Sequence, residues 1–469
     1  MRSAGEVGLV ERGVIEGFYG RPFSHAQRLA LLRFAGERGF NCYVYAPKND
    51  PLHRERWREP YPETELHRFR ELAATGAAHG VRLVYALAPG LTYDAAEPRD
   101  FEHLEAKVHD VIAAGARGIA LLFDDLTADS TTLDPAVQAT LIARTGELVA
   151  AIDPTLVFWF IGNFYCGDAT ELRSGTGFWS TLYGRSAADY FAAYDAFVPA
   201  SVPIMWTGPA VFSGTISARD AADFRAIARR PVVLWDNFPV NDALPGQIFL
   251  GPYLGREPDA LAELHGVVLN LMSQACANQI PLATAADCLA DAERYEPESS
   301  LTRAVASLAP DATAAVHLAA FVAQHRGHPV LAAGAAAIEL QQRIAAAFAA
   351  QMPDVRALAV LREHLVLLAD NEQRLRDSLG AHAILVEIEP WSRQLTRLAR
   401  AALAGLDALQ GLADRTTYEK ARDLTRAHDE VVAATRLPQS LLPFVAGHGE
   451  PVDRFAALFK AIDDRLGAS

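Results

Sequence analysis

Short apolar runs alternate with longer amphipathic segments up to about residue 270 of the chain. Runs of this length that are rich in β-branched and aromatic residues are typical of strands buried on both faces. The expected strands cover residues 13–17, 40–46, 81–88, 118–125, 156–161, 203–206, 231–235 and 266–269. Eight strands separated mostly by helices predict an α/β protein with a closed, TIM-like (β/α)8 barrel. An open doubly wound sheet is the alternative, but no glycine-rich dinucleotide-binding motif follows the first strand.

Two of the predicted helices have clear start signals. Ser24 is placed to cap a helix that continues to about Arg38. Asp134 followed by Pro135 is expected to start a helix that ends near Ile152, because proline is favoured at the first helical position. Further helices are expected over residues 63–79, 101–114 and 218–229.

The pattern changes at about Thr302, where strand signals end and apolar residues recur at helical spacing. Helices are expected over residues 305–321, 331–348, 355–376, 381–409, 417–435 and 452–466. No solenoid-type repeat motif is evident, so an up-and-down helical bundle is favoured over a solenoid. The sequence therefore predicts a barrel domain over 1–285 and an all-α bundle domain over 286–469.

The composition limits the classes of partner. The 469-residue chain has 43 Lys and Arg against 57 Asp and Glu, a net charge of -14, without a basic run. Nucleic acid and anionic membranes are therefore not expected as partners. The four cysteines lie far apart without metal-type spacing, and neither a metal nor a cofactor is expected. The N-terminus has no apolar signal-peptide core and no run is long enough to span a bilayer, which predicts a cytoplasmic protein.

The fourth expected strand ends in two adjacent carboxylates, Asp124 and Asp125. Neighbours on a strand point to opposite faces, so both can serve one pocket only if the chain turns at Asp125. The carboxyl end of a buried parallel strand is where α/β folds place their chemistry. Two close carboxylates do not ionise equally, which gives one acid and one charge stabiliser. The alternative is structural, because Asp is also favoured as a helix N-cap.

In a closed barrel, the residues at the carboxyl ends of the strands converge on one pocket. These residues are Gly17, Phe18, Tyr19, Lys48, Asn49, Asp50, Asp124, Asp125, Tyr165, Trp206, Trp235, Asp236, Asn237, Asp242 and Asn270. Aromatic faces pack against the apolar face of a sugar ring, and carboxylates and amides bond to its hydroxyls. A phosphate site would instead need Arg and backbone N–H donors, so a carbohydrate site is favoured.

Several of these strand ends lie in longer motifs. They are VIEGFYG at 14–20, YAPKND at 45–50, LAPG at 87–90, LLFDD at 121–125, YCG at 165–167, MWTGP at 205–209, LWDN at 234–237 with ND at 241–242, and LGPY at 250–253. In this order they resemble glycoside hydrolase family 84, the family of O-GlcNAcases and of bacterial enzymes historically called hyaluronidases. The resemblance runs from residue 13 to about 270, and the helical remainder resembles the family only in its arrangement.

The resemblance implies a retaining exo-β-N-acetylglucosaminidase that uses substrate assistance, in which the substrate's 2-acetamido oxygen attacks and closes to an oxazoline. By the family pattern, Asp124 orients the acetamide N–H and stabilises developing positive charge. Asp125 then protonates the leaving oxygen and later deprotonates water. Tyr165 resembles the tyrosine that bonds the acetamido oxygen. The remaining substrate-binding residues implied are Gly17, Lys48, Trp235, Asp236, Asn237, Asp242 and Asn270.

The outer part of the expected site departs from some relatives. Ala169 and Ala243 stand where those relatives carry aromatic residues, which widens or flattens the region of the leaving group. The favoured partner is a peptide or protein with GlcNAc on Ser or Thr, or another terminal β-GlcNAc glycan. Three alternatives are action on a polysaccharide such as hyaluronan, an inactive glycan-binding module, and a scaffold whose bundle recruits partners.

Overall fold

The computed structural model describes residues 9–127, 129–174, 178–244, 246–328, 335–349, 354–432 and 452–467. The chain divides into two compact units. The first comprises Met1–Val240, Tyr253–Ser273 and Ala285–Tyr295, and the second comprises Asn241–Pro252, Gln274–Thr284 and Glu296–Ser469.

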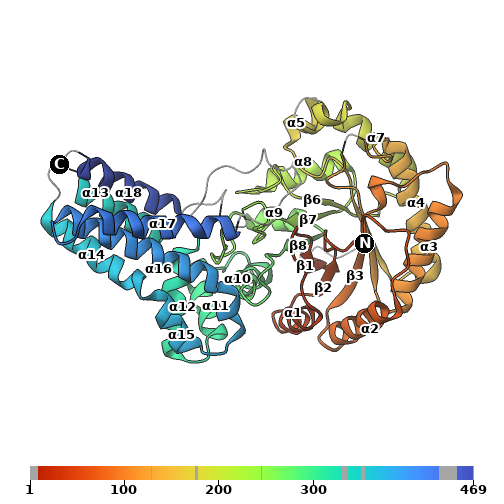
Figure 1. The fold of residues 1–469 in the computed structure, drawn as a ribbon. Coiled ribbons are helices and arrows are strands. Elements are labelled where there is room, and N and C mark those ends of the chain that lie inside the picture. Colours follow the sequence, from red (N-terminus) through yellow and green to blue (C-terminus); the bar gives the residue numbers. More distant parts are fainter. Residues whose placement is uncertain are drawn as a thin grey trace. The chain divides into compact units, whose positions relative to one another are not determined.

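The first unit is a closed barrel of parallel strands, as the sequence predicts (Figure 1). Its strands are β1 (Glu11–Glu16), β2 (Cys42–Tyr45), β3 (Arg82–Leu87), β4 (Gly118–Leu122), β5 (Val157–Ile161), β6 (Ile204–Trp206), β7 (Val232–Asp236) and β8 (Gly266–Asn270). They pair in chain order, and β1 closes the ring on β8 with Ile15 opposite Asn270. The alternative of an open sheet is therefore wrong.

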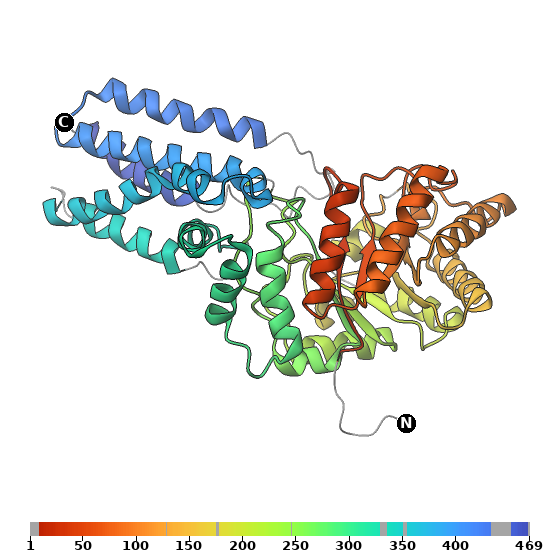
Figure 2. The same cartoon turned by 90° about the horizontal axis from the view of Figure 1, so that it is seen from below.

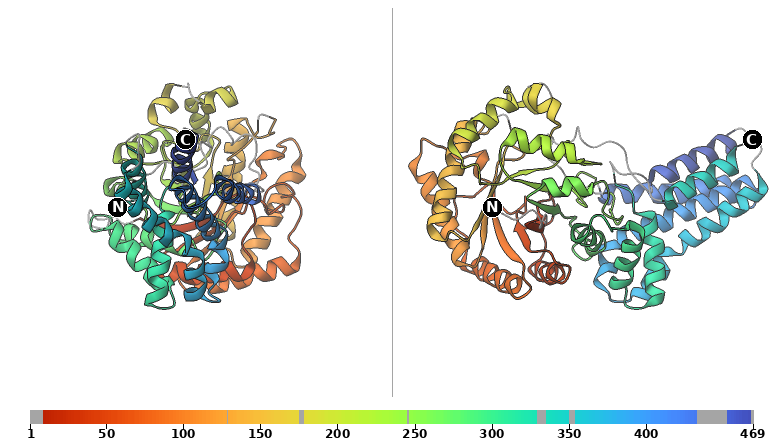
Figure 3. Two further views of the ribbon diagram at one scale, coloured as in Figure 1. Left: turned by 60° about the vertical axis from the view of Figure 1, so that its left-hand side comes forward. Right: turned by 180° about the vertical axis from the view of Figure 1, so that it is seen from behind.

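Helices surround the strands of this unit (Figures 1 and 3). They are α1 (His25–Glu37), α2 (Glu63–Ala78), α3 (Pro98–Ala113), α4 (Pro135–Ile152), α5 (Ala169–Ser174), α6 (Phe178–Tyr183), α7 (Ala187–Phe197), α8 (Ala218–Ala228) and α9 (Pro258–Glu263), with a short 3-10 turn at Pro89–Leu91. Both predicted N-caps are confirmed. The Ser24 side chain accepts from the N–H of Gln27, and Asp134 accepts from the N–H of Ala136.

The connection between β5 and β6 contains three helices, α5, α6 and α7, although the sequence indicated none of them. Short length explains the omission of α5 and α6, because each spans only 6 residues and gives little periodic signal. This connection brings α6 close to the residues that follow β5, since Trp179 packs against Tyr165 with ring centroids 4.7 Å apart.

The second unit is helical (Figure 2). Its helices are α11 (Pro297–Leu308), α12 (Ala312–Gln324), α13 (Ala335–Phe348), α14 (Val355–Ala369), α15 (Asn371–Leu379), α16 (Ala383–Leu409), α17 (Arg415–Val432) and α18 (Val452–Leu466), and α10 (Gln279–Ala290) begins in it. The long α16 contacts α14, α15, α17 and α18, which makes it the centre of the bundle.

Two helices that the sequence predicts as continuous are broken in the structure. The expected helix 305–321 is interrupted after α11, because Asp311 caps a new helix by accepting from the N–H of Ala314. Pro310 precedes that cap and cannot donate a helical hydrogen bond. The expected helix 355–376 ends at Ala369, and α15 starts at Asn371.

The segments 241–252 and 274–284 group with the helical unit, whereas the sequence boundary at 285 assigns them to the barrel. Their hydrogen bonds explain the difference. The N–H of Leu250 donates to the carbonyl of His325, and the indole of Trp391 donates to the carbonyl of Gly246 at 3.0 Å. The N–H groups of Cys276 and Ala277 both donate to Glu387.

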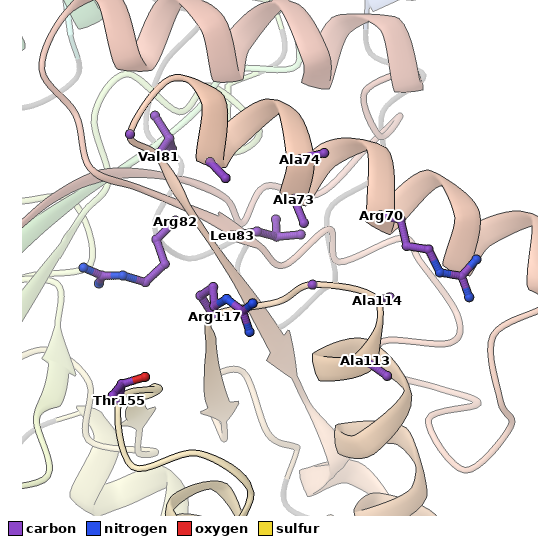
Figure 4. Close-up of a pocket in the computed structure, with 13 residues that line it drawn as sticks. Arg70, Ala73, Ala74, Val81, Arg82, Leu83, Ala113, Ala114, Arg117 and Thr155 are labelled. Carbon is purple, nitrogen blue, oxygen red and sulfur yellow. The ribbon is translucent and has the colours of Figure 1, made fainter.

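A hollow of about 560 Å³ lies where β3 begins, between α2 and the loop before β4 (Figure 4). Small residues line it, together with Arg70, Arg82 and Arg117. Arg82 is paired with Glu11, and Arg70 is paired with Glu63. This is the amino-terminal end of the strands, where barrel residues generally serve stability rather than chemistry.

Candidate active site

The chain turns at the end of β4, as a shared pocket for the two carboxylates requires. Asp124 and Asp125 follow the strand, and Asp125 has a left-handed backbone with φ 53°. Asp tolerates this conformation better than most residues because its short side chain can bond locally. Asp124 is 7% exposed, so its charge lies in a largely dry environment.

Lys48 connects the two carboxylates. It lies in the loop after β2, is 6% exposed, and its Nζ donates to Oδ2 of Asp124. The same Nζ lies 4.0 Å from Oδ2 of Asp125. It also lies 5.4 Å from the ring centroid of Trp235, so the cation faces the end of β7.

The second oxygen of Asp124 is buried and has no donor among the residues that the structure describes. An unsatisfied buried acceptor costs about 1–3 kcal/mol. Oδ1 of Asp124 is therefore ready to accept a hydrogen bond from a bound molecule.

Two phenols hold Asp125. Tyr19 donates to Oδ2 at 2.9 Å, and Tyr165 donates to Oδ1 at 2.8 Å. Burial raises the pKa of Tyr19 and of Tyr165 well above the ordinary value, and the charge of Asp125 raises both further. Both therefore remain protonated donors at neutral pH.

A chain of amides joins the ends of β1, β7 and β8. The N–H of Gly17 donates to Oδ1 of Asn270 at 3.1 Å, and Asn270 donates to Oδ1 of Asn237 at 2.9 Å. The indole of Trp235 donates to the same oxygen of Asn237 at 3.2 Å. A Cβ on Gly17 would lie 2.4 Å from the Trp235 ring, so this contact requires glycine.

The structure thus brings together eight of the nine sequence-predicted residues that lie in the barrel and in the adjoining loops. Seven of them are Gly17, Lys48, Asp124, Asp125, Tyr165, Trp235 and Asn270. The eighth is Asn237, which joins them through its side-chain oxygen. All these residues lie at the carboxyl ends of strands or in the loops that follow them, as expected for a barrel site.

Asp236 has a different environment from Trp235. Its two oxygens accept from the guanidinium of Arg256 at 2.5 and 2.7 Å, and from the hydroxyl of Tyr253 at 2.6 Å. Because neighbours on a strand point to opposite faces, Asp236 points away when Trp235 faces Lys48. Its carboxylate is engaged by other protein groups and is 1% exposed.

Asp242 and Ala243 belong to the segment 241–252 of the second unit, so a contact of Asp242 with the sugar stays a prediction. Ala169 is the first residue of α5.

Sequence reasoning missed the role of Arg54 and of α6. Arg54 is 8% exposed and donates to Tyr19 and to the backbone of Asp125. In α6, the Trp179 indole donates to Sγ of Cys166 at 2.9 Å, and its ring stacks on Tyr183. For Arg54, the available sequence signal was an arginine six residues after Lys48 in a pocket predicted to be acidic. No comparable sequence signal indicates α6.

Within the described ranges, no group of three or more His, Cys, Asp or Glu side chains is placed to hold a metal ion. None of the helices in those ranges is both long and apolar enough to cross a bilayer.

Comparison with known proteins gives concordant matches. A family model described as beta-N-acetylglucosaminidase (NAGidase) matches residues 12–323. The proteins named Protein O-GlcNAcase from Rattus norvegicus and Mus musculus are each 31% identical over 278 residues. That match covers 58% of this chain and 29% of each relative, so the chain spans less than a third of their length.

Solved structures match over nearly the whole chain. A mutant of the Thermobaculum terrenum O-GlcNAc hydrolase has a TM-score of 0.80 at 24% identity, covering 99% of this chain and 95% of that one. CpGH84B has a TM-score of 0.78 at 24% identity, covering 97% of this chain and 77% of that one. At this identity the two structures establish the fold.

Proposed function

The chain belongs to the β-N-acetylglucosaminidase family of glycoside hydrolases, and from this premise we propose that it is a retaining exo-enzyme for terminal β-linked GlcNAc. The proposed substrate is GlcNAc on Ser or Thr of a peptide or protein. The proposed nucleophile is the 2-acetamido oxygen of the substrate itself, an exception to the usual retaining pair of carboxylates.

The observation that carries this proposal is the unequal treatment of the two adjacent acids. Asp124 has one oxygen on Lys48 and one buried oxygen without a donor among the described residues. The N–H of the substrate acetamide fits that oxygen, because the bond would satisfy the acceptor and turn the acetamido oxygen towards the anomeric carbon. The charge of Asp124 would then stabilise the positive charge of the forming oxazoline ring.

Asp125 is suited to the proton transfers. In the first step it gives a proton to the glycosidic oxygen as the C1–O bond breaks, and in the second step it takes one from the attacking water. Tyr165, which bonds Asp125 in the free protein, is proposed to move its hydrogen bond to the acetamido oxygen of bound substrate.

The remaining barrel residues are proposed to bind the sugar. Trp235 and Asn237 would line the acetamido pocket, and the backbone of Gly17 with the side chains of Lys48 and Asn270 would hold ring substituents. We assign Asp242 a hydroxyl contact on sequence grounds. Asp236 is proposed to hold the neighbouring Trp235 in position rather than to bind the sugar, since Arg256 and Tyr253 bind the Asp236 carboxylate.

The first test compares release of a fluorogenic phenol from its β-GlcNAc and β-GalNAc glycosides. Turnover of the GlcNAc glycoside alone supports the proposal, and no turnover of either by folded protein contradicts it. A series with one, two and three fluorines on the acetyl group then tests the nucleophile. Fluorine withdraws electrons from the acetamido oxygen, so kcat should fall steeply along the series, and a flat series would exclude substrate assistance.

A further inference from the structure

Arg54 stabilises the turn that presents Asp125. It comes from the loop after β2, and its Nη2 donates to the backbone carbonyl of Asp125 at 3.1 Å. That carbonyl belongs to the residue with the left-handed backbone, a conformation that the surroundings must hold in place. Arg54 therefore acts on the position of Asp125 without contacting its carboxylate.

The other terminal nitrogen of Arg54 determines where the Tyr19 hydroxyl proton points. Its Nη1 donates to the hydroxyl of Tyr19 at 3.2 Å, and that hydroxyl donates to Oδ2 of Asp125 at 2.9 Å. A guanidinium can only donate, so Tyr19 has to accept from Arg54 and its own proton is directed to Oδ2. Burial lowers the pKa of Arg54, but the neighbouring Tyr19, Asp124 and Asp125 outweigh burial and raise it, so Arg54 stays charged.

The other oxygen of Asp125 lacks such a constraint. Tyr165 donates to Oδ1, and among the described residues no cation donates to the Tyr165 hydroxyl in turn. A hydroxyl rotor of this kind can turn its proton away or accept one. The two oxygens of Asp125 therefore differ. Oδ2 always accepts a hydrogen bond from Tyr19, whereas Oδ1 can lose its hydrogen bond from Tyr165.

We propose that Arg54 is a positioning residue that, through Tyr19 and the Asp125 carbonyl, reserves Oδ2 as an acceptor and makes Oδ1 the oxygen that carries the catalytic proton. This rests on the proposed function. In the first step the Oδ1–H bond breaks, the proton passes to the glycosidic oxygen, and that oxygen keeps the electrons of the broken C1–O bond. The resulting carboxylate keeps its bond from Tyr19 and regains a proton on Oδ1 from the water that opens the oxazoline.

The test compares Arg54→Met with Arg54→Lys and with the parent enzyme. The substrates are a β-GlcNAc umbelliferyl glycoside, whose leaving group is good, and a GlcNAc-serine peptide, whose leaving group is poor. Arg54→Met should lower kcat/KM for the peptide about 10- to 100-fold more than for the aryl glycoside, because only the poor leaving group needs full acid assistance. Arg54→Lys keeps the charge but not both bonds, and should fall between.

The matched control is Arg56→Met, in the same loop. The side chain of Arg56 is 56% exposed, and among the described residues its ion-pair partner is Glu59 at the surface. The kcat/KM values for both substrates should therefore stay within about twofold of the parent. Thermal midpoints and inhibition by free GlcNAc, which needs the sugar pocket but not the acid, separate loss of acid assistance from loss of structure.

A double-mutant cycle tests the route through Tyr19. Tyr19→Phe removes the hydroxyl that links Arg54 to Oδ2, so Arg54→Met should cost less in that background than in the parent. Additive losses, or equal losses on both substrates in folded Arg54→Met or Arg54→Lys, would overturn the assignment of Arg54. Absence of turnover by the parent enzyme would instead overturn the proposed function itself.

Discussion

At the scale of single residues, Asp124 and Asp125 differ through their partners. A lysine holds one oxygen of Asp124 and leaves the other without a described donor, whereas tyrosines hold both oxygens of Asp125. Asp124 therefore has the Lys48 cation as its partner. Asp125 instead accepts from two hydroxyls, of which Arg54 directs one and the other is free to rotate, and these surroundings suit the exchange of a proton.

Asp124→Asn should lower kcat for good and poor leaving groups alike. The amide would lose the negative charge that stabilises the oxazoline ring, and this stabilisation is needed whatever group leaves. Loss of an electrostatic contact of this kind typically costs about 10²–10³-fold in kcat. Steady-state rates on an aryl glycoside and on a glycopeptide measure the effect, and near-normal rates on either would contradict this role.

Asp125→Ala should distinguish between leaving groups. General acid assistance is worth about 10²–10⁴-fold where the leaving oxygen is strongly basic and much less where it is not. The variant should therefore retain most activity on the best aryl leaving groups and lose nearly all on a serine-linked sugar. A plot of log kcat/KM against leaving-group pKa should become steeper than that of the parent, and parallel lines would argue against an acid role.

His53 makes the fold sensitive to acid. Burial, together with a smaller effect of the Lys48 charge, lowers the pKa of His53 from the ordinary 6.5 to about 3. As pH falls below about 6.5, His53 therefore takes up a proton in the unfolded chain but stays neutral in the folded protein. The contribution of His53 to the free energy of unfolding is fully present above about pH 6.5. It is lost as pH falls towards 3, by up to about 1.4 kcal/mol per pH unit. His53→Gln should unfold with a shallower acid dependence in urea titrations, and identical slopes would disprove this linkage.

At the scale of elements, the strands of the barrel could be located closely from the sequence, because apolar runs and N-cap residues are local signals. The helices α5 and α6 were missed, since short helices have too few turns to show a period. The break at Asp311 was missed because apolar residues recur at helical spacing on both sides of it, although Pro310 and Asp311 are local signals for a break. The environment of Asp236 was missed for another reason. Arg256 lies 20 residues away in sequence, and only the fold brings the two together.

Asp236→Asn tests how much the ion pair between Asp236 and Arg256 stabilises the end of β7. The substitution would leave the buried Arg256 charge without its counter-ion, and removing one partner of a buried pair typically costs about 3–5 kcal/mol. We expect a large fall in the free energy of unfolding with a smaller change in KM. Asp223→Asn is the control, because its surface pairs with Arg173 and Arg219 are worth at most about 1 kcal/mol. A stable variant with a strongly raised KM would instead place Asp236 in direct contact with substrate.

At the scale of the whole molecule, the helical unit includes two segments of the chain that come from between elements of the barrel sequence. The segments 241–252 and 274–284 follow β7 and β8 in sequence, yet their backbones are bonded to helical residues such as His325, Glu387 and Trp391. The folding of these two segments should therefore depend on the helical unit.

Glu387 is the residue on which that dependence can be measured. Its Oε2 accepts from the N–H groups of Cys276 and Ala277 at 2.7 and 3.0 Å. Glu387→Ala would leave both donors without this acceptor, at a cost of about 1–3 kcal/mol, whereas Glu387→Gln keeps a neutral acceptor and should cost less. Hydrogen exchange at 276 and 277 should accelerate in the alanine variant while amides of the barrel strands stay protected. Glu339→Ala, which removes an exposed pair with Arg343, should change neither. If exchange at 276 and 277 stayed slow without Glu387, other contacts would have to hold this segment, and the helical unit would lose its role in ordering it.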